Sequence, residues 1–189
     1  ELVSFERDLD ALALALAHPG AFPHVRHRAP HVLAARGACV DGDVRWRLRL
    51  GDFLAELATA PAPALVFYDP FSPRVDAPMW TLATFRRLFA HLAPGAELIT
   101  YTRSTAIRSG LLAAGFWVAH GAPTGDKPET TLAVARPRAD AGAAPGPYRW
   151  LGADWLARRA RSAARFPADA QPGDHAGIDQ AISEHPQFA

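Results

Sequence analysis

Apolar segments of strand length alternate with helical segments between residues 2 and 135. The predicted strands cover residues 2–6, 44–50, 64–68, 98–102, 116–120 and 130–135. Strands that alternate with helices form a mostly parallel sheet with helices on both faces. No helix separates the last two strands, so we expect them to form a terminal β-hairpin. The pattern predicts an α/β fold.

The predicted helices and turns divide the chain further. Helices are expected at residues 7–18, 53–58, 78–92 and 105–114, and another between residues 22 and 37 that ends at Gly37. Asp41-Gly42 predicts a turn. Residues 136–147 (RPRADAGAAPGP) have the composition of a linker, and residues 148–189 are expected to form a helical C-terminal tail that docks through its aromatic side chains.

Composition excludes several classes of protein. The chain has 189 residues, of which 49% are apolar, and its formal net charge is +1. This charge produces no overall field for nucleic acid, although Arg158, Arg161 and Arg165 share one face of the tail helix, which is usually solvated but leaves RNA contact as an option. No apolar run reaches the length of about 18 residues that spans a membrane.

Metal and disulfide chemistry is not expected. Cys39 is the single cysteine, which excludes an internal disulfide and a thiolate zinc cluster, and we expect an inert thiol. His24, His27 and His31 have the spacing of a helix face, but Pro30 interrupts it and no carboxylate joins them. The sequence therefore predicts no metal site.

Three acidic residues stand at the carboxyl ends of predicted strands, where open parallel sheets bind ligands. Glu6 can accept hydrogen bonds from a ribose diol, or it can serve as a helix N-terminal acid. Asp52 can accept from an adenine amino group, or it can cap the helix that begins at Phe53. Both alternatives stay open for each residue.

Asp69 carries the most specific signal, because the apolar strand LVFYD leads directly into the loop DPFSP. Pro70 and Pro73 make this loop rigid and leave its carbonyl groups and the Asp69 carboxylate to face a pocket. A carboxylate in such a loop can orient an amine nucleophile and accept its proton, or Asp69 can serve as the cap of an ordinary loop between a strand and a helix. Phe71 can stack on a flat substrate ring.

The chain has no Gly-x-Gly sequence, so it lacks the glycine-rich turn that lets a nucleotide cofactor approach the backbone. The terminal hairpin is the layout of a Rossmann-like class I methyltransferase sheet rather than a dinucleotide-binding one. In that layout the glycine-rich turn follows a strand that precedes ELVSFE, which already has a full strand pattern. We therefore expect the chain to be the C-terminal part of a longer protein, with the first strand and its turn missing.

Residues 66–133 resemble the MnmC-type methyltransferases in several motifs. The shared features are the Asp-x-Phe-x-Pro loop at Asp69, Met79-Trp80-Thr81, the Pro94-Gly95 turn and Ala114-Gly115-Phe116. SFERDLDALALAL and LRLGDFLAEL are similar to the second strand and the acidic cofactor motif of that family. The resemblance covers most of residues 1–135, which is then a partial methyltransferase-like domain.

The resemblance implies N-methylation, dependent on S-adenosylmethionine, of an aminomethyl group on the wobble uridine of tRNA in the cytoplasm. By match, Glu6 would hold the ribose, Asp52 with Phe53 the adenine, and Asp69 the substrate amine. Pro70, Phe71, Trp80 and Lys127 would contact substrate, with Lys127-Pro128 standing where the family has a Lys-Arg pair. The alternatives are a methyltransferase for small amines and a non-catalytic scaffold that binds tRNA or protein.

Overall fold

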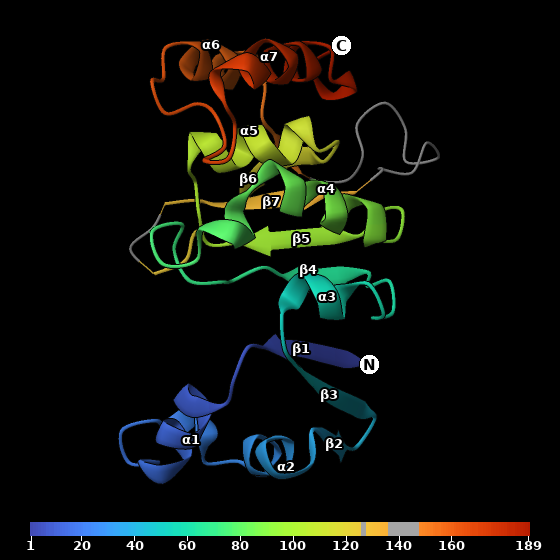
Figure 1. Ribbon diagram of the computed structural model, residues 1–189, viewed down its shortest axis with the longest axis vertical. Coiled ribbons are helices and arrows are strands. Elements are labelled where there is room, and N and C mark those ends of the chain that lie inside the picture. The colour runs from blue at the N-terminus through green and yellow to red at the C-terminus, as the bar shows by residue number, and fades with distance from the viewer. Residues whose placement is uncertain (126–127, 136–147) are drawn as a thin grey trace. The chain divides into compact units, whose positions relative to one another are not determined.

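The computed structural model describes residues 1–125, 128–135 and 148–189 (Figure 1). The chain forms two compact units, Glu1–Pro61 and Ala62–Ala189. Each unit has its own sheet.

The first unit contains a sheet of order β1-β3-β2. Its elements are β1 (Leu2–Glu6), α1 (Asp10–Ala17), α2 (Arg28–Arg36), β2 (Ala38–Asp41), β3 (Val44–Leu50) and α3 (Phe53–Leu57). Strands β1 and β3 are parallel with Glu6 opposite Leu50, so their carboxyl ends coincide. Cys39 is buried with Ala29 and Leu33 of α2 in an apolar cluster. The thiol therefore belongs to the core of this unit.

The second unit contains a sheet of order β4-β5-β7-β6-β8. Its elements are β4 (Leu65–Phe67), α4 (Leu82–His91), β5 (Glu97–Thr100), α5 (Thr105–Ala113), β6 (Trp117–Gly121), β7 (Thr130–Val134), β8 (Arg149–Trp150), α6 (Ala153–Ala160) and α7 (His175–Ser183). Strand β4 is parallel to β5, and the remaining pairings of this sheet are antiparallel. The antiparallel pair β6–β7 is the predicted terminal hairpin.

The C-terminal residues belong to the second unit and pack on its sheet and helices (Figure 1). The side chain of Gln187 accepts a hydrogen bond from Val118 N at 2.6 Å and donates to Val118 O and Leu151 O at 2.9 and 2.8 Å. Helix α7 packs against α5 through the buried Ile178 and Ile182. The predicted linker at residues 136–147 lies outside the described residues.

The structure corrects the predicted sheet and one helix. Two of the six pairings between described strands are parallel, so the expectation of a mostly parallel sheet is wrong. The short strands β2 and β8, which the sequence analysis did not predict, add antiparallel pairs. The helix expected at residues 78–92 is divided, because Thr81 is extended and its side chain accepts a hydrogen bond from Thr84 N. A 3₁₀ helix at Ala77–Trp80 precedes this cap, and α4 follows it.

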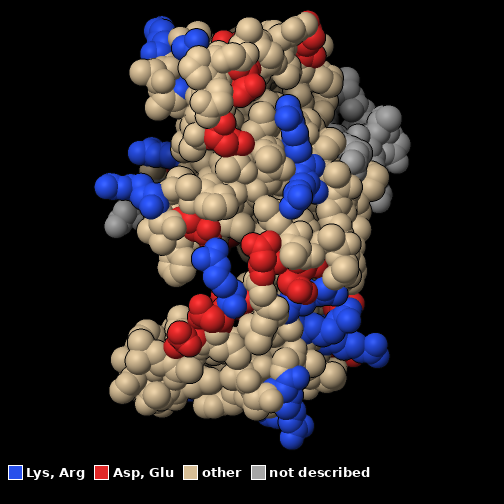
Figure 2. Space-filling model, in the orientation of Figure 1, with Lys and Arg blue, Asp and Glu red and all other residues tan. Residues whose placement is uncertain are grey.

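In the described residues, no helix combines the length and apolar character needed to cross a membrane. Basic and acidic side chains are interspersed over the face shown in Figure 2.

Candidate active site

The carboxyl ends of β1 and β3 bring Glu6 and Asp52 together in the first unit. Glu6 ends β1, and its backbone carbonyl accepts a hydrogen bond of 2.9 Å from Gly51 N, directly after β3. Gly51 has a φ of 139°, a conformation that side chains rarely adopt, and it turns the chain into Asp52. The glycine thus fixes the two acids at one edge of the sheet.

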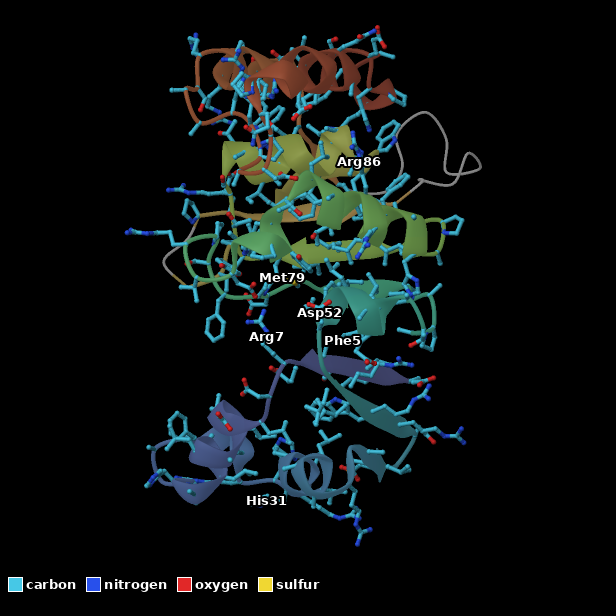
Figure 3. All side chains as sticks on the ribbon, in the orientation of Figure 1. Phe5, Arg7, His31, Asp52, Met79 and Arg86 are labelled. Carbon is cyan, nitrogen blue, oxygen red and sulfur yellow. The ribbon has the colours of Figure 1, made fainter. Side chains whose placement is uncertain are left out.

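Asp52 caps α3, as one of its two predicted roles requires. Its Oδ1 accepts a hydrogen bond of 3.0 Å from Ala55 N, while the residue stays exposed. The next residue, Phe53, packs its ring edge-on against Phe5 with ring centroids 5.1 Å apart. Figure 3 shows Phe5 and Asp52 at this edge of the first unit. One oxygen of Asp52 is committed to the helix, and the other is available to a ligand.

The pKa of Glu6 is raised, first because partial burial disfavours its charged form and second because the charge of Asp8 repels it. No hydrogen-bond donor contacts its carboxylate in the described part of the chain. Two hydroxyl donors of a ribose would therefore stabilise this carboxylate. Glu6 and Asp52 fit the ribose and adenine of S-adenosylmethionine, and none of the described residues is assigned to its methionine part.

Asp69 follows β4 in the second unit and begins the DPFSP loop. It is exposed, and it has no hydrogen bond or ion pair with the described residues. The preceding Tyr68 is buried, its N–H donates to Ile99 O at 2.8 Å, and its hydroxyl donates to Met79 O. The strand end is therefore held firmly while the carboxylate stays accessible.

Two aromatic side chains donate hydrogen bonds to carbonyl groups of the DPFSP loop. Trp80 Nε1 donates to Phe71 O at 2.7 Å, and the Tyr101 hydroxyl donates to Pro70 O at 3.4 Å. The loop carbonyls that were expected to face a pocket thus have partners within the protein. Burial, and then the charge of Asp69, raises the pKa of Tyr101, which keeps its hydroxyl protonated as a donor.

The other residues predicted to contact substrate differ in their exposure. Trp80 is fully buried, so its ring supports the loop and presents no surface to a substrate. Phe71 is 73% exposed and offers a free aromatic face at the loop surface. Pro70 lies between Asp69 and Phe71 in the same loop. Lys127 lies outside the described residues.

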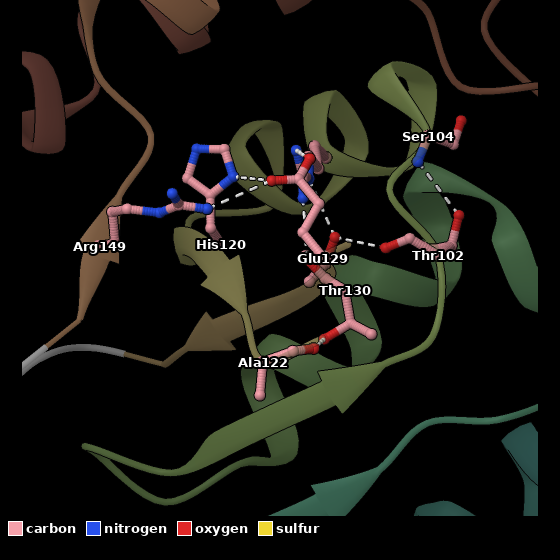
Figure 4. A network of polar contacts seen from close by, with 9 residues as sticks. Thr102, Ser104, His120, Ala122, Glu129, Thr130 and Arg149 are labelled. Atoms are coloured by element: carbon pink, nitrogen blue, oxygen red, sulfur yellow. Dashed lines mark hydrogen bonds and ion pairs between the residues drawn. The ribbon is translucent and has the colours of Figure 1, made fainter. Parts of the chain in front are cut away.

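A polar network occupies the same edge of this sheet (Figure 4). Arg108 is buried, with Nε 2.9 Å from Thr131 Oγ1, Nη2 2.8 Å from Thr130 O and Nη1 3.2 Å from Glu129 Oε1. Glu129 also contacts His120 and, at 3.5 Å, Arg149. Burial raises the pKa of Glu129, but the hydrogen bond to His120 and the charge of Arg108 outweigh this and hold it below its usual range. The network neutralises a buried guanidinium.

Sequence reasoning missed Tyr101 and Arg108. Tyr101 directly follows β5, so its position at a strand end was a usable signal. Arg108 interrupts the apolar face formed by Ile107, Leu111 and Leu112 on α5, which indicates a buried cation that needs an acid. No group of three or more His, Cys, Asp or Glu side chains in the described residues is arranged to hold a metal ion.

Residues 24–136 match a family described as S-adenosyl-L-methionine-dependent methyltransferases. The bifunctional protein MnmC of tRNA 5-methylaminomethyl-2-thiouridine biosynthesis from Methylibium petroleiphilum is 34% identical over 151 residues, which are 79% of this chain and 21% of that protein. The protein of the same name from Cupriavidus metallidurans is 43% identical over 99 residues, which are 51% of this chain and 15% of that protein.

A solved structure has the same fold. The crystal structure of MNMC2 from Aquifex aeolicus superposes with a TM-score of 0.62 at 19% identity, and the match covers 96% of this chain and 65% of that one. The chain spans about a fifth of the length of the Methylibium relative. The family match covers more than half of the chain and includes Asp52, Asp69 and the hairpin. The chain therefore belongs to the family of S-adenosyl-L-methionine-dependent methyltransferases.

Proposed function

We propose that the protein is an N-methyltransferase that acts on an aminomethyl group of the wobble uridine in tRNA, in the cytoplasm. The observation that carries the proposal is the Asp69 carboxylate, which is exposed and has no hydrogen bond or ion pair among the described residues. It stands at the start of a loop that hydrogen bonds from Trp80 and Tyr101 stabilise. The printed names of the relatives, which refer to tRNA 5-methylaminomethyl-2-thiouridine biosynthesis, support the choice of acceptor.

The cofactor would be held by the acids of the first unit. The Glu6 carboxylate can accept from both hydroxyls of a ribose, and the free oxygen of Asp52 can accept from an adenine amino group. Phe53 offers an apolar ring beside Asp52. S-adenosylmethionine, when bound, supplies an electrophilic methyl group on a sulfonium sulfur.

The amine would be held by the loop of the second unit. Asp69 can accept N–H hydrogen bonds from a neutral amine, which orients the nitrogen lone pair, and it can take up the proton that the nitrogen loses. Phe71 can stack on the uracil ring that carries the aminomethyl group. Pro70 and the buried Trp80 keep the loop in place, and Lys127 is proposed as a further contact to the RNA.

An acceptor comparison tests this function. The full-length protein is incubated with methyl-labelled S-adenosylmethionine and three acceptors: tRNA with aminomethyluridine at the wobble position, the same tRNA with plain uridine, and the free aminomethyl nucleoside. We expect label in the first acceptor only. Label in the free nucleoside alone would favour a small-amine methyltransferase, and cofactor or tRNA binding without any transfer would favour a scaffold.

A further inference from the structure

A cavity of about 580 Å³ lies beside β6, β8 and α6 in the second unit, and no residue of the DPFSP loop lines it. His120 of β6 and Trp150 of β8 form part of its lining, and Arg158 and Arg161 of α6 form another part. The volume falls within the usual range of ligand pockets. None of the residues assigned above to cofactor or amine lines this cavity.

The two arginines of the cavity form no ion pair with a carboxylate of the described residues. Within the described residues, Glu129 pairs with Arg108, His120 and Arg149, and Asp179 pairs with Arg159 and Arg165. Arg158 and Arg161 are exposed and have no carboxylate within 4.0 Å in the same part of the chain. Their guanidinium groups are therefore free to bind an anion such as a phosphodiester.

The charge of Arg158 extends toward the edge of the sheet. Burial lowers the pKa of Arg108, the charge and the hydrogen bond of Glu129 oppose this shift, and the positive charges of Arg158 and Arg103 lower the pKa to a smaller extent. Asp154 also lines the cavity, but it lies in the first turn of α6, where a carboxylate complements the helix dipole. The arginines outnumber this single acid, so the cavity favours an anion.

An aromatic wall accompanies the arginines. Trp150 is half-buried, and its ring packs edge-on against Trp117 and Tyr148 at centroid distances of 5.5 and 5.1 Å. Trp155, which also lines the cavity, is buried and stacks on Phe188. Rigid aromatic rings beside arginines bind a base together with its phosphate, which is typical of single-stranded RNA recognition.

The cavity and the DPFSP loop lie along the same edge of the sheet. Thr131 of β7 pairs with Thr100 at the end of β5 and with His120 near the end of β6, so these two strand ends are aligned. Tyr101 follows Thr100 and donates to Pro70 O of the loop, whereas His120 lines the cavity. A nucleic acid chain can therefore follow this edge from one place to the other.

We propose that the cavity between β6, β8 and α6 binds a phosphodiester and a base of the substrate RNA, a few nucleotides from the one presented to the DPFSP loop. This site rests on the proposed function for the identity of the RNA. Arg158 and Arg161 bind the phosphate, and the half-buried ring of Trp150 forms the wall beside the base.

The test compares RNA affinities of matched double variants of the full-length protein. Arg158→Gln with Arg161→Gln removes the two cavity charges. Arg86→Gln with Arg87→Gln on α4 removes two other exposed charges that have no ion pair among the described residues (Figure 3). The probe is tRNA with aminomethyluridine at the wobble position, and its dissociation constant is measured over a series of salt concentrations.

We expect the cavity variant to bind about tenfold more weakly than the parent at ~0.1 M salt. Its slope of log affinity against log salt should fall by roughly 0.7–0.9, which corresponds to one lost phosphate contact. The RNA affinity of the α4 variant should fall by less than about twofold, because this variant loses only a screened long-range attraction. Asp154→Asn should bind about two- to threefold more tightly, because it removes the one acid of the cavity.

Equal losses in the two double variants, or an unchanged salt slope in the cavity variant, would overturn the cavity as a site. Unchanged thermal unfolding of each variant excludes a loss of fold. Binding that depends on Arg158 and Arg161 without methyl transfer would leave the cavity standing and reject the proposed function. Methyl transfer to tRNA, with an RNA affinity that does not depend on Arg158 and Arg161, would support the proposed function and reject the cavity as a site.

Discussion

Asp69 and Glu6 are both carboxylates at a strand end, but they differ in what surrounds them. Glu6 is partly buried near Asp8 and has a raised pKa, so its charged form lacks compensation. Asp69 is exposed, and its loop is held by Tyr101 and Trp80. The Glu6 carboxylate, which lacks hydrogen-bond donors, can accept from the hydroxyl groups of a ligand. The exposed Asp69 carboxylate in its rigid loop can accept from a substrate amine.

Glu6→Ala is expected to weaken binding of S-adenosylmethionine. Hydrogen bonds to a charged group are worth about 1.5–3 kcal/mol, which corresponds to a loss of about tenfold or more. Titration calorimetry on the full-length protein measures this affinity, with Asp41→Asn, an exposed acid at the end of β2, as the control for charge. Unchanged affinity in Glu6→Ala would remove Glu6 from the cofactor site.

Glu129 predicts a pH dependence of stability. Its folded-state pKa is lowered, so its contribution is fully present above the ordinary pKa of 4.5 and is lost as pH falls through the lowered value. Glu129→Gln leaves the buried Arg108 without its negative partner and should lower the free energy of unfolding by about 1–3 kcal/mol at pH 7.

Urea unfolding of the parent and Glu129→Gln at pH 7 and at successively lower pH checks this expectation. The difference between the two proteins should shrink as pH falls below 4.5. A difference that stays constant, or grows, toward acid pH would show that the carboxylate charge does not stabilise this network.

At the scale of elements, α5 sits closely against α4. A Cβ built at Gly110 of α5 would lie 2.9 Å from Phe85 of α4 and 3.3 Å from Pro167. Phe85 is fully buried. Asp169, in the same tail segment as Pro167, accepts a hydrogen bond of 2.9 Å from Leu82 N at the start of α4. The tail thus helps to fix the helix that follows the DPFSP loop.

Gly110→Ala should destabilise the second unit by about 1–3 kcal/mol, because the added methyl overpacks the α4–α5 contact. Gly177→Ala in α7 is the matched control, since a Cβ there meets nothing within 4 Å. Alanine has the higher helix propensity, so Gly177→Ala should stabilise by about 0.5–1 kcal/mol. Chemical denaturation measures both, and equal effects of the two substitutions would contradict the packing argument.

The elements predicted from sequence were those with long or strongly patterned segments. Strand β3 was predicted from its alternating apolar side chains, and Gly37 was predicted as the end of α2. Strands β2 and β8 have four and two residues, and pairing with β3 and β6 stabilises them. The roles of Tyr101 and Trp80 depend on contacts across the fold, which spacing along the chain does not encode.

At the scale of the whole molecule, a net charge of +1 conceals local differences. Glu129 and Asp179 contact five basic side chains, while Arg158 and Arg161 remain unpaired among the described residues. Composition argued against an overall field for nucleic acid, and this local imbalance required the structure. The strand-end acids, in contrast, were identified from sequence because their positions depend on local pattern alone.

The central claim is that Asp69 orients the substrate amine and accepts its proton. The direct measurement is kcat for methyl transfer to tRNA with aminomethyluridine by the full-length protein and by Asp69→Asn, with Asp41→Asn as the matched control. Asparagine keeps the size and one acceptor but loses the charge. We expect kcat to fall by about 10²–10⁴-fold in Asp69→Asn, with cofactor affinity within about twofold and the control unchanged. Turnover by Asp69→Asn close to that of the parent would contradict the account.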